Sequence, residues 1–356
     1  MKILSIETSC DETAIAILDI SGPLEKPEIK VLGNTLMSQV ALHEEYGGVF
    51  PALAKREHIK NLPLLLAEAL KQAGMSADMP PIDYIGVTTG PGLEPALWTG
   101  IVFAKELGEK WGKPVIPVNH MEGHICSVLY GLEKPLELPA LALLVSGGHT
   151  ELVHVRSLGD YEIIGHTVDD AVGEAFDKVA RMLGLTYPGG PKISRLAENA
   201  REKGIKLDVE LPRPMIHSGD LNFSYSGLKT AVLYKLKANA NGDLSEEYKE
   251  KIARAFEDSA VDVLVTKTRR ALEDLVDTKT LIVAGGVSGN KYLSEKLHEM
   301  VQDFSGLTLL FPDKFLTTDN AIMIGIAGYV RAQGHPEELS TPQVLEADGN
   351  LSINSH

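Results

Sequence analysis

Apolar and polar positions follow two periods along this chain, one typical of buried strands and one typical of helices. Short runs rich in Val, Ile and Leu predict strands at 2–6, 13–18, 84–88, 115–118, 140–145, 151–155, 280–284 and 308–311. Longer segments with a helical period predict helices at 53–73, 93–111, 169–183, 226–237, 246–276, 290–303 and 320–332. Because strands alternate with helices, the pattern indicates an α/β protein whose sheets are flanked by helices.

One local pattern occurs twice. An apolar strand, a polar bend and a second strand fill 3–17, and the same order returns at 141–153. Both bends carry small or hydroxyl side chains, which leave backbone N–H groups free to face a phosphate. Two related hairpins, one in each half of the chain, could therefore hold phosphates from both sides of a cleft. Two unrelated hairpins are the alternative that the sequence leaves open.

Composition narrows the class of protein. With 356 residues, 44% apolar and 23% charged, the chain is long enough for two domains with separate cores. Its two cysteines, Cys10 and Cys126, form no paired motif, which favours a reducing compartment. The apolar runs are too short to span a bilayer, and Glu7 interrupts the N-terminal one, so we expect a cytoplasmic protein without a membrane partner. The net charge of −15 argues against unassisted binding to nucleic acid.

Candidate chemistry centres on His120 and His124, which lie four residues apart. That spacing places both imidazoles on one helix face, where a distant carboxylate such as Asp319 could complete a zinc or iron(II) site. A zinc peptidase would need Glu directly after the first His. Here Glu122 comes two residues later and lies about 200° around the helix, away from the histidines. A histidine pair without a metal is the alternative, since buried or solvated histidines are common.

Two glycine-rich segments could approach a ligand. The first lies at 285–290, directly after a buried strand, and leads into a helix near Asn290. It is neither a Walker A loop nor a dinucleotide-binding fingerprint. The second is a loop at 187–191, preceded by a helix that carries Asp177, whose carboxylate could accept hydrogen bonds from a ligand hydroxyl. Each segment could also be only a tight connection or a capped helix.

Together these segments resemble one family throughout, the tRNA N6-adenosine threonylcarbamoyltransferases in their bacterial form. The matching motifs lie, in order, at 6–13, 47–51, 56–58, 90–92, 120–124, 145–151, 169–178, 187–191, 223–230, 284–290 and 318–320. The resemblance implies the ASKHA fold of actin, sugar kinases and heat-shock chaperones, with two related α/β domains around a nucleotide cleft. We expect one subdomain at 1–134, a second at 135–314, a helix at 315–336 that returns to the first, and a flexible tail at 337–356.

The resemblance also implies a reaction. A threonylcarbamoyl group passes from threonylcarbamoyl-AMP to N6 of adenosine 37, in tRNAs that read codons beginning with A, and AMP is released. A sugar or acetate kinase of the same fold would instead need Mg²⁺ and phosphoryl transfer, without the histidine pair. A member that only scaffolds a complex would be expected to lack the histidines or the carboxylate at 319, and all three are present.

Site residues follow by position. The resemblance implies that His120, His124 and Asp319 hold one divalent ion, Fe²⁺ or Zn²⁺. It implies that the adenylate binds at a second set of positions: Leu144, Val145, Ser146, Gly147, Gly148, Asp177, Gly190 and Asn290. N6 of adenosine is a poor nucleophile, so its proton needs an acceptor. Asp11 and Glu12, in the first hairpin bend, are our candidates for that catalytic role.

Partners are the last expectation. The family resemblance implies that a catalytically inactive paralogue pairs with this chain and that a small ATPase resets the complex. Lys55, Arg56, His58 and Lys60 form a short basic stretch that could touch the tRNA. A solvated helix face explains the same stretch equally well.

Overall fold

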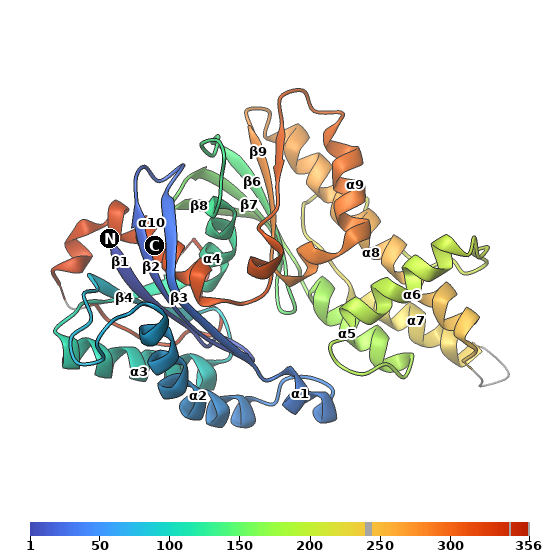
Figure 1. Ribbon diagram of the computed structural model, residues 1–356. Helices are drawn as coiled ribbons and strands as arrows, with labels where there is room; N and C mark the ends of the chain where they lie inside the picture. Colours follow the sequence, from blue (N-terminus) through green and yellow to red (C-terminus); the bar gives the residue numbers. More distant parts are fainter. Residues whose placement is uncertain (239–243, 342, 355–356) are drawn as a thin grey trace. The chain divides into compact units, whose positions relative to one another are not determined.

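The computed structural model describes residues 1–238, 244–341 and 343–354. The chain forms two compact units (Figure 1). Unit 1 comprises Met1–Glu137, Arg156–Glu162 and Pro312–His356, and unit 2 comprises Leu138–Val155 and Ile163–Phe311. The subdomain boundaries expected from sequence, at 134 and 314, stay a prediction. Among the described residues, no helix is both long and apolar enough to cross a membrane.

Unit 1 is built on a five-stranded sheet with the order β3-β2-β1-β4-β5. Its strands are β1 (Lys2–Glu7), β2 (Glu12–Ser21), β3 (Glu28–Ser38), β4 (Tyr84–Gly90) and β5 (Val115–Asn119). Strand β2 pairs antiparallel with both β1 and β3. On the other side of β1, the pairs β1–β4 and β4–β5 are parallel. Ile6 lies opposite Ile15 in the first hairpin, as the predicted strand–bend–strand pattern requires.

Unit 2 repeats this arrangement with the order β8-β7-β6-β9-β10. Its strands are β6 (Ala140–Val145), β7 (Thr150–Ser157), β8 (Asp160–His166), β9 (Thr280–Ala284) and β10 (Thr308–Leu310). Strand β6 pairs antiparallel with β7 and parallel with β9, as β1 does with β2 and β4. The two hairpins thus occupy equivalent positions, and the related-hairpin interpretation of the sequence is confirmed.

Helices cover the sheet of unit 1. They are α1 (Val40–His43), α2 (Pro51–Gln72), α3 (Glu94–Trp111), α4 (His120–Cys126) and α10 (Ala321–Gly334), with short 3-10 turns η1 (Glu44–Tyr46), η2 (Ser127–Leu129), η4 (Lys314–Leu316) and η5 (Pro336–Leu339). Apolar side chains of α2 and α3, such as Leu62 and Ile101, form one core with Leu4 and Ile6 of β1. Helix α10 packs on β1 and β2 so closely that a Cβ at Gly325 would come within 2.5 Å of Leu18 Cδ1.

Unit 2 has its own core. Its helices are α5 (Val172–Met182), α6 (Gly190–Glu202), α7 (Ser226–Ala238), α8 (Glu246–Asp274) and α9 (Lys291–Val301), with the 3-10 turn η3 (Gly286–Gly289). Phe176 of α5 and Phe256 of α8 meet edge to face, with ring centroids 4.9 Å apart. They pack with Leu141 and Leu143 of β6. Each unit thus contains an apolar core of its own, which agrees with the size of the chain.

Several elements are absent from the sequence prediction, among them the short helix α1, the strands β3 and β8 and the helix α6. Strands β3 and β8 are absent from the prediction because each lies at an edge of its sheet, where exposed polar residues interrupt the apolar ones. Helix α6 was read only as a glycine-rich loop, since it opens with Gly190 and Pro191. Proline is well tolerated in the first turn of a helix, so this opening is a helix start rather than a turn.

The segment after residue 337 makes specific contacts with unit 1. Leu345 and Ile353 are buried, and Leu345 joins the core formed by α2 and α3. The Asp348 amide donates to Thr89 O at 2.9 Å, and Gly92 N donates to Gly349 O at 3.2 Å. These contacts tie part of the segment to the loop after β4, in contrast to the free tail expected from its sequence.

Substituting Leu345 tests this docking. Leu345→Ala removes a buried side chain and should lower the free energy of unfolding by about 2 kcal/mol, which corresponds to roughly 4 °C or more in Tm. The neighbouring Val344 is 81% exposed, so Val344→Ala serves as the matched control with an unchanged Tm. Thermal unfolding of both variants makes the comparison, and equal Tm values would contradict the docking.

Candidate metal centre and transfer site

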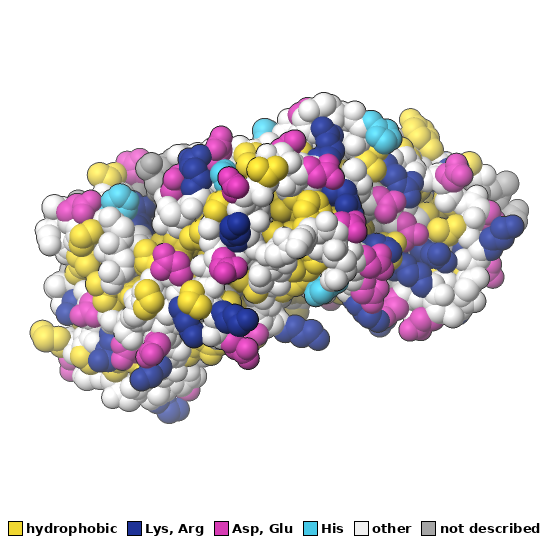
Figure 2. Space-filling model, turned by 90° about the horizontal axis from the view of Figure 1, so that it is seen from above, with side chains coloured by type: hydrophobic (Ala, Val, Ile, Leu, Met, Phe, Trp, Pro, Cys, Tyr) yellow, Lys and Arg dark blue, Asp and Glu magenta, His cyan; other side chains and the backbone are white. Residues whose placement is uncertain are grey.

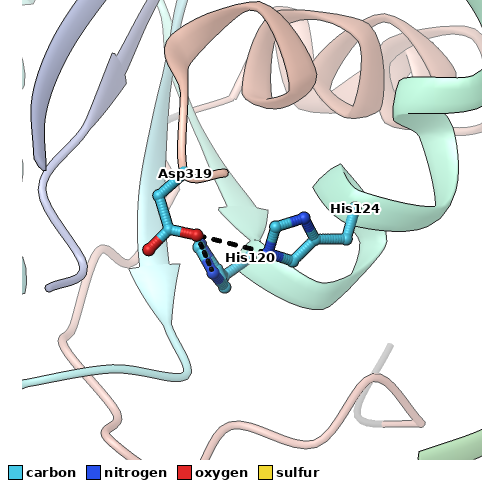
Figure 3. A group of neighbouring side chains, drawn as sticks. All are labelled: His120, His124 and Asp319. Atoms are coloured by element: carbon cyan, nitrogen blue, oxygen red, sulfur yellow. Dashed lines mark ion pairs between the residues drawn. The ribbon is translucent and has the colours of Figure 1, made fainter. Parts of the chain in front are cut away.

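Helix α4 positions the histidine pair. Asn119 caps its start, accepting hydrogen bonds from Met121 N at 2.8 Å and Glu122 N at 3.3 Å. The cap fixes where the helix begins, so His120 and His124 follow one turn apart on the same face. Their ring centroids are 4.7 Å apart and the rings are nearly perpendicular (Figure 3).

Asp319 reaches the same place from the far end of the sequence. The adjacent Asn320 caps α10, accepting from Met323 N at 2.9 Å and donating to Thr318 O at 2.7 Å, which fixes the loop that carries Asp319. Asp319 Oδ1 lies 3.4 Å from His120 Nε2 and 3.3 Å from His124 Nε2 (Figure 3). The three residues expected from sequence to share a metal are therefore neighbours.

Close packing of two helices makes this meeting possible. Gly123 of α4 faces α10, where a Cβ would come within 3.0 Å of Ile324 and 3.2 Å of Met323 side-chain atoms. A larger residue at Gly123 would push α4 away from α10. The histidines and Asp319 would then move apart, because the histidines lie on α4 and Asp319 lies in the loop directly before α10.

The donor set suits a metal ion. One nitrogen or oxygen from each of His120, His124 and Asp319 can be chosen so that all lie within 4.8 Å of one another. His124 is fully buried, and its Nδ1 has no hydrogen-bond partner among the described residues, while its Nε2 faces Asp319. A buried polar nitrogen without a partner is unfavourable unless something else satisfies it. Two imidazoles and one carboxylate suit a divalent transition metal with further positions open.

Electrostatics around the centre also favour a cation. Burial raises the pKa of Asp319, but His120 and His124 lower it by more, so its carboxylate stays charged. Burial lowers the pKa of His120, but the carboxylates of Asp319 and Glu7 outweigh it and hold this pKa well above its usual range. Net negative charge therefore surrounds the three donors and attracts a positive ion or, without one, a proton.

Glu7 is a part of the site that the sequence analysis missed. Its buried carboxylate Oε2 lies 3.2 Å from His120 Nδ1 and accepts from Thr88 Oγ1 at 2.6 Å, while Oε1 accepts from Ser9 N. A carboxylate on Nδ1 fixes the imidazole tautomer and leaves Nε2 free to face Asp319. The signal was present, since a glutamate inside an otherwise apolar strand needs a buried partner.

Glu122 lies apart from the metal donors. Its Oε1 accepts from Tyr161 Oη at 3.0 Å, and burial raises the pKa of its carboxyl to about 7. Glu122 is not among the residues that could share an ion with His120 and His124. The prediction that this glutamate points away from the histidines is confirmed, and a zinc-peptidase arrangement is excluded.

The β1–β2 bend, defined as residues 8–13 so that it includes the first two residues of β2, places Asp11 and Glu12 close together. Asp11 is buried, and its Oδ2 has no hydrogen-bond partner among the described residues. Burial, with the charges of Asp11 and Asp319, raises the pKa of Glu12 to about 9. Glu12 therefore keeps its proton near neutral pH, and a hydrogen bond from Ser38 Oγ at 3.1 Å holds it.

The expected adenylate residues all lie in unit 2. Leu144 and Val145 are buried in β6, and Ser146, Gly147 and Gly148 form the turn into β7, where Ser146 N donates to His149 O at 2.9 Å. Neighbouring glycines let other backbone segments approach this turn. A Cβ at Gly173 would come within 2.5 Å of Ser146 O, and one at Gly285 within 2.5 Å of Val145 O.

Three further positions join helices of unit 2. Asp177 of α5 accepts from Gly189 N at 2.7 Å, which secures the loop before Gly190 and α6. Asn290 caps α9 by accepting from Leu293 N at 2.8 Å, and its amide donates to Ser194 Oγ and Glu257 Oε1. The Asn290 side chain thus has a structural function in this state.

The predicted basic stretch is smaller than expected. His58 is fully buried and cannot touch RNA, which corrects the sequence interpretation. Its neighbours Lys55, Arg56 and Lys60 are exposed, but Glu57 pairs with Arg56 at 3.4 Å and Lys60 at 3.1 Å. Helical periodicity explains the difference, since His58 lies on the side of α2 that faces the sheet.

Metal content tests the proposed donors. After incubation with Zn²⁺ or, without oxygen, Fe²⁺, wild type should retain about one ion per chain, whereas His124→Ala and Asp319→Asn should bind at least about tenfold more weakly. His217→Ala removes an exposed histidine of unit 2 and should behave as wild type. Equilibrium dialysis with elemental analysis measures the difference. Full retention by His124→Ala would remove it from the donor set.

The raised pKa of Glu12 predicts a pH dependence. The folded chain keeps a proton on Glu12 up to about pH 9, whereas the unfolded chain releases it above the ordinary value of 4.5. This term therefore destabilises the fold increasingly as pH rises through that window, by at most about 1.4 kcal/mol per pH unit. In metal-free protein, Glu12→Gln should become more stable relative to wild type between about pH 5 and about pH 8 in urea unfolding. Exposed Glu28→Gln is the control, and parallel stability curves for wild type and Glu12→Gln would refute the shift.

Comparison with known proteins agrees with this site. Residues 30–326 match the protein family TsaD, tRNA N6-adenosine threonylcarbamoyltransferase. Two curated relatives with that name, from Burkholderia vietnamiensis and Burkholderia mallei, are each 48% identical to this chain. The first aligns over 345 residues and the second over 344, in both cases 96% of this chain and 95% of the relative.

Solved structures agree on the fold. T. kodakarensis HypF superposes with a TM-score of 0.60 at 14% identity, covering 96% of this chain and 49% of HypF. Component A of (R)-2-hydroxyglutaryl-CoA dehydratase from Acidaminococcus fermentans gives a TM-score of 0.50 at 11% identity, covering 93% of this chain and 99% of that protein. Both are ASKHA-fold proteins, so the predicted fold class is confirmed. With relatives of this name over nearly its whole length, and with a buried His-His-Asp group that could hold a metal, the chain belongs to the tRNA N6-adenosine threonylcarbamoyltransferase family.

Proposed function

We propose that this protein transfers the threonylcarbamoyl group of threonylcarbamoyl-AMP to N6 of adenosine 37 in tRNAs that read codons beginning with A. The observation that carries the proposal is the buried group of His120, His124 and Asp319 in a chain of this family. A kinase of the same fold would have no use for this group. A scaffold protein would have no reason to keep it intact.

The metal in this proposal is one Fe²⁺ or Zn²⁺ ion held by His120, His124 and Asp319. When bound, it would supply positive charge that neutralises the donor substrate and orients it. The chain prepares this place through Glu7, which fixes the ring of His120, and through Asn320, which fixes the loop of Asp319. Neutral imidazole and carboxylate suit both metals, so the choice between them belongs to experiment.

The reaction needs few groups from the protein. N6 of adenosine attacks the carbamoyl carbon, the bond from that carbon to the phosphate oxygen breaks, and AMP leaves with the electron pair. A mixed anhydride is already activated, so a covalent enzyme intermediate is unnecessary. The nitrogen must lose one proton as the new bond forms, and a carboxylate near the reacting atoms can accept it.

Asp11 is the better of our two candidates for that acceptor. Its Oδ2 is buried without a partner and can receive a hydrogen bond from a substrate N–H. The pKa of Glu12 is raised to about 9, so near neutral pH Glu12 already holds a proton and serves better as a donor to a neighbouring oxygen. Asp11 would then accept the proton of the nucleophile, and Glu12 would donate a hydrogen bond to a neighbouring oxygen.

Binding of the adenylate is proposed for unit 2. The turn Ser146, Gly147 and Gly148 offers backbone N–H groups with open space beside both glycines, since a Cβ at either would meet nothing within 4 Å. The start of α6 at Gly190 and the η3 turn before Asn290 add further backbone donors. Leu144 and Val145 anchor the strand that carries the turn, while Asp177 and Asn290 secure the loops beside it.

Partners complete the proposal. The face in Figure 2 carries Lys and Arg side chains interspersed with Asp and Glu, in keeping with a net charge of −15 and with help from other proteins in binding tRNA. We propose an inactive paralogue and a small ATPase as these partners. Large exposed apolar side chains on β3, α1, η1 and α2 offer a surface for one of them: Leu36, Met37, Leu42, Tyr46, Phe50 and Ile59. The two free cysteines, Cys10 and Cys126, and a tRNA substrate agree with action in the cytoplasm.

Transfer of labelled threonylcarbamoyl to a tRNA with adenosine at position 37 tests the function. With both partner proteins present, wild type should transfer, and His124→Ala should lose activity together with its metal. Asp11→Asn should keep the metal yet slow transfer by about 100-fold or more, because it removes the proton acceptor. Each protein is assayed with and without the partners.

Three results would count against parts of this proposal. Wild type with bound metal and intact partners that transfers nothing would sink the function itself. Full activity in His124→Ala would remove the metal from the mechanism. Full activity in Asp11→Asn would remove that residue as the acceptor and leave the function standing.

A further inference from the structure

A buried histidine, His58, hydrogen-bonds to the β1–β2 bend, and the proposed reaction assigns it no function. His58 of α2 is fully buried, with Nε2 3.0 Å from Cys10 O and Nδ1 2.8 Å from Thr13 Oγ1. Its two ring nitrogens therefore bracket Asp11 and Glu12 in sequence. A buried histidine with both nitrogens engaged is held in one orientation.

The partners of His58 determine its protonation state. A carbonyl oxygen only accepts, so Nε2 carries the hydrogen that reaches Cys10 O. In a neutral ring Nδ1 then accepts, from the Thr13 hydroxyl and from Gln39 Nε2 at 3.3 Å. Burial lowers the pKa of His58, in agreement with a neutral ring.

The same direction of donation continues away from the bend. Gln39 Oε1 accepts from His43 Nε2 at 3.2 Å, and His43 Nδ1 accepts from Phe50 N at 3.3 Å. Gln39 also donates through its backbone N to Asp11 O at 2.9 Å. A directed chain of hydrogen bonds thus runs from Phe50 N through two imidazoles and one amide side chain to Cys10 O, while the backbone N of Gln39 separately holds Asp11 O.

The rest of the bend has separate support. Thr8 Oγ1 donates to Ala96 O at 3.1 Å, and Leu93 N donates to Ser9 O at 2.8 Å, so the start of α3 secures residues 8 and 9. The carbonyls of the next two residues, Cys10 and Asp11, receive their hydrogen bonds from His58 and Gln39. The backbone at Cys10 and Asp11 is therefore supported by these two residues, while Glu12 and Thr13 also pair with Ser38 and Met37 of β3.

We propose that His58, with Gln39, is a positioning residue for the transfer reaction: it holds the backbone of residues 10–13 so that the Asp11 and Glu12 carboxyls face the substrates. This inference rests on the proposed function. Misplacement of a reacting group by about 1 Å can slow catalysis roughly 100-fold. Buried polar networks of this kind fix one geometry only when every member has its partner.

Variants of His58 separate positioning from simple stability. His58→Leu fills the space but removes the donor to Cys10 O and the acceptor for Gln39. His58→Gln retains one donor and one acceptor on its carboxamide. Leu65→Ala is the matched control, because it removes a buried apolar side chain of the same helix, α2, away from the bend.

Kinetics with the full set of partners provide the first readout. His58→Leu should lower kcat about 100-fold, with metal content and the KM for the adenylate unchanged. His58→Gln should recover at least about tenfold of that loss, and Leu65→Ala should lower Tm while kcat stays within about twofold of wild type. An unchanged kcat in His58→Leu, or a loss no larger than in Leu65→Ala, would overturn the proposal.

Labelling of Cys10 provides a readout independent of activity. Cys10 is half-buried within the bend, whereas Cys126 is fully buried, so a maleimide should react at Cys10. The reaction should be slow in wild type and Leu65→Ala and at least about tenfold faster in His58→Leu, because the loosened bend exposes the thiol. Cys10→Ala confirms the labelled position. Equal labelling rates would show that His58 does not hold the bend, even if wild-type transfer failed for another reason.

Discussion

The packing of α4 against α10 is the constraint on which the candidate centre depends. Gly123 lets the two helices pack closely, so that the two histidines of α4 meet the aspartate just before α10. Each helix start is fixed by its own asparagine cap, Asn119 or Asn320. The two caps and the helix contact therefore position the three candidate donors through the chain's own packing.

Charge is the second constraint. Glu7, Asp319, Asp11 and Glu12 gather in or beside the core of unit 1, where carboxylates are unfavourable unless they are protonated or paired with a positive group. Glu12 is protonated, and the imidazole of His120 supplies positive charge beside Glu7 and Asp319. Acidic groups that prepare a place for a cation and groups that handle a proton are thus neighbours, which suits metal-assisted transfer to a weak nucleophile.

The repeated sheet explains where function lies in the chain. Each unit begins with a hairpin in the same position of its sheet, and a short bend connects the two strands of each hairpin. In unit 1 the bend carries acids and is fastened by His58 and Gln39. In unit 2 the equivalent bend carries glycines and is approached closely by Gly173 and Gly285. One architecture therefore supports a proton-handling bend in one half and an open glycine turn in the other.

The sequence by itself determined the central strands, most helices, the repeat and the candidate group of His120, His124 and Asp319, because periodicity, helix spacing and ordered motifs can be read along the chain. Only the tertiary structure revealed the edge strands β3 and β8, since pairing at a sheet edge leaves little apolar pattern. It also decided the environments of single side chains. Glu7 became a partner of His120, and His58 moved from an expected RNA contact to the support of the bend. These environments depend on contacts between residues that are far apart in the sequence. Local sequence patterns do not reveal such contacts.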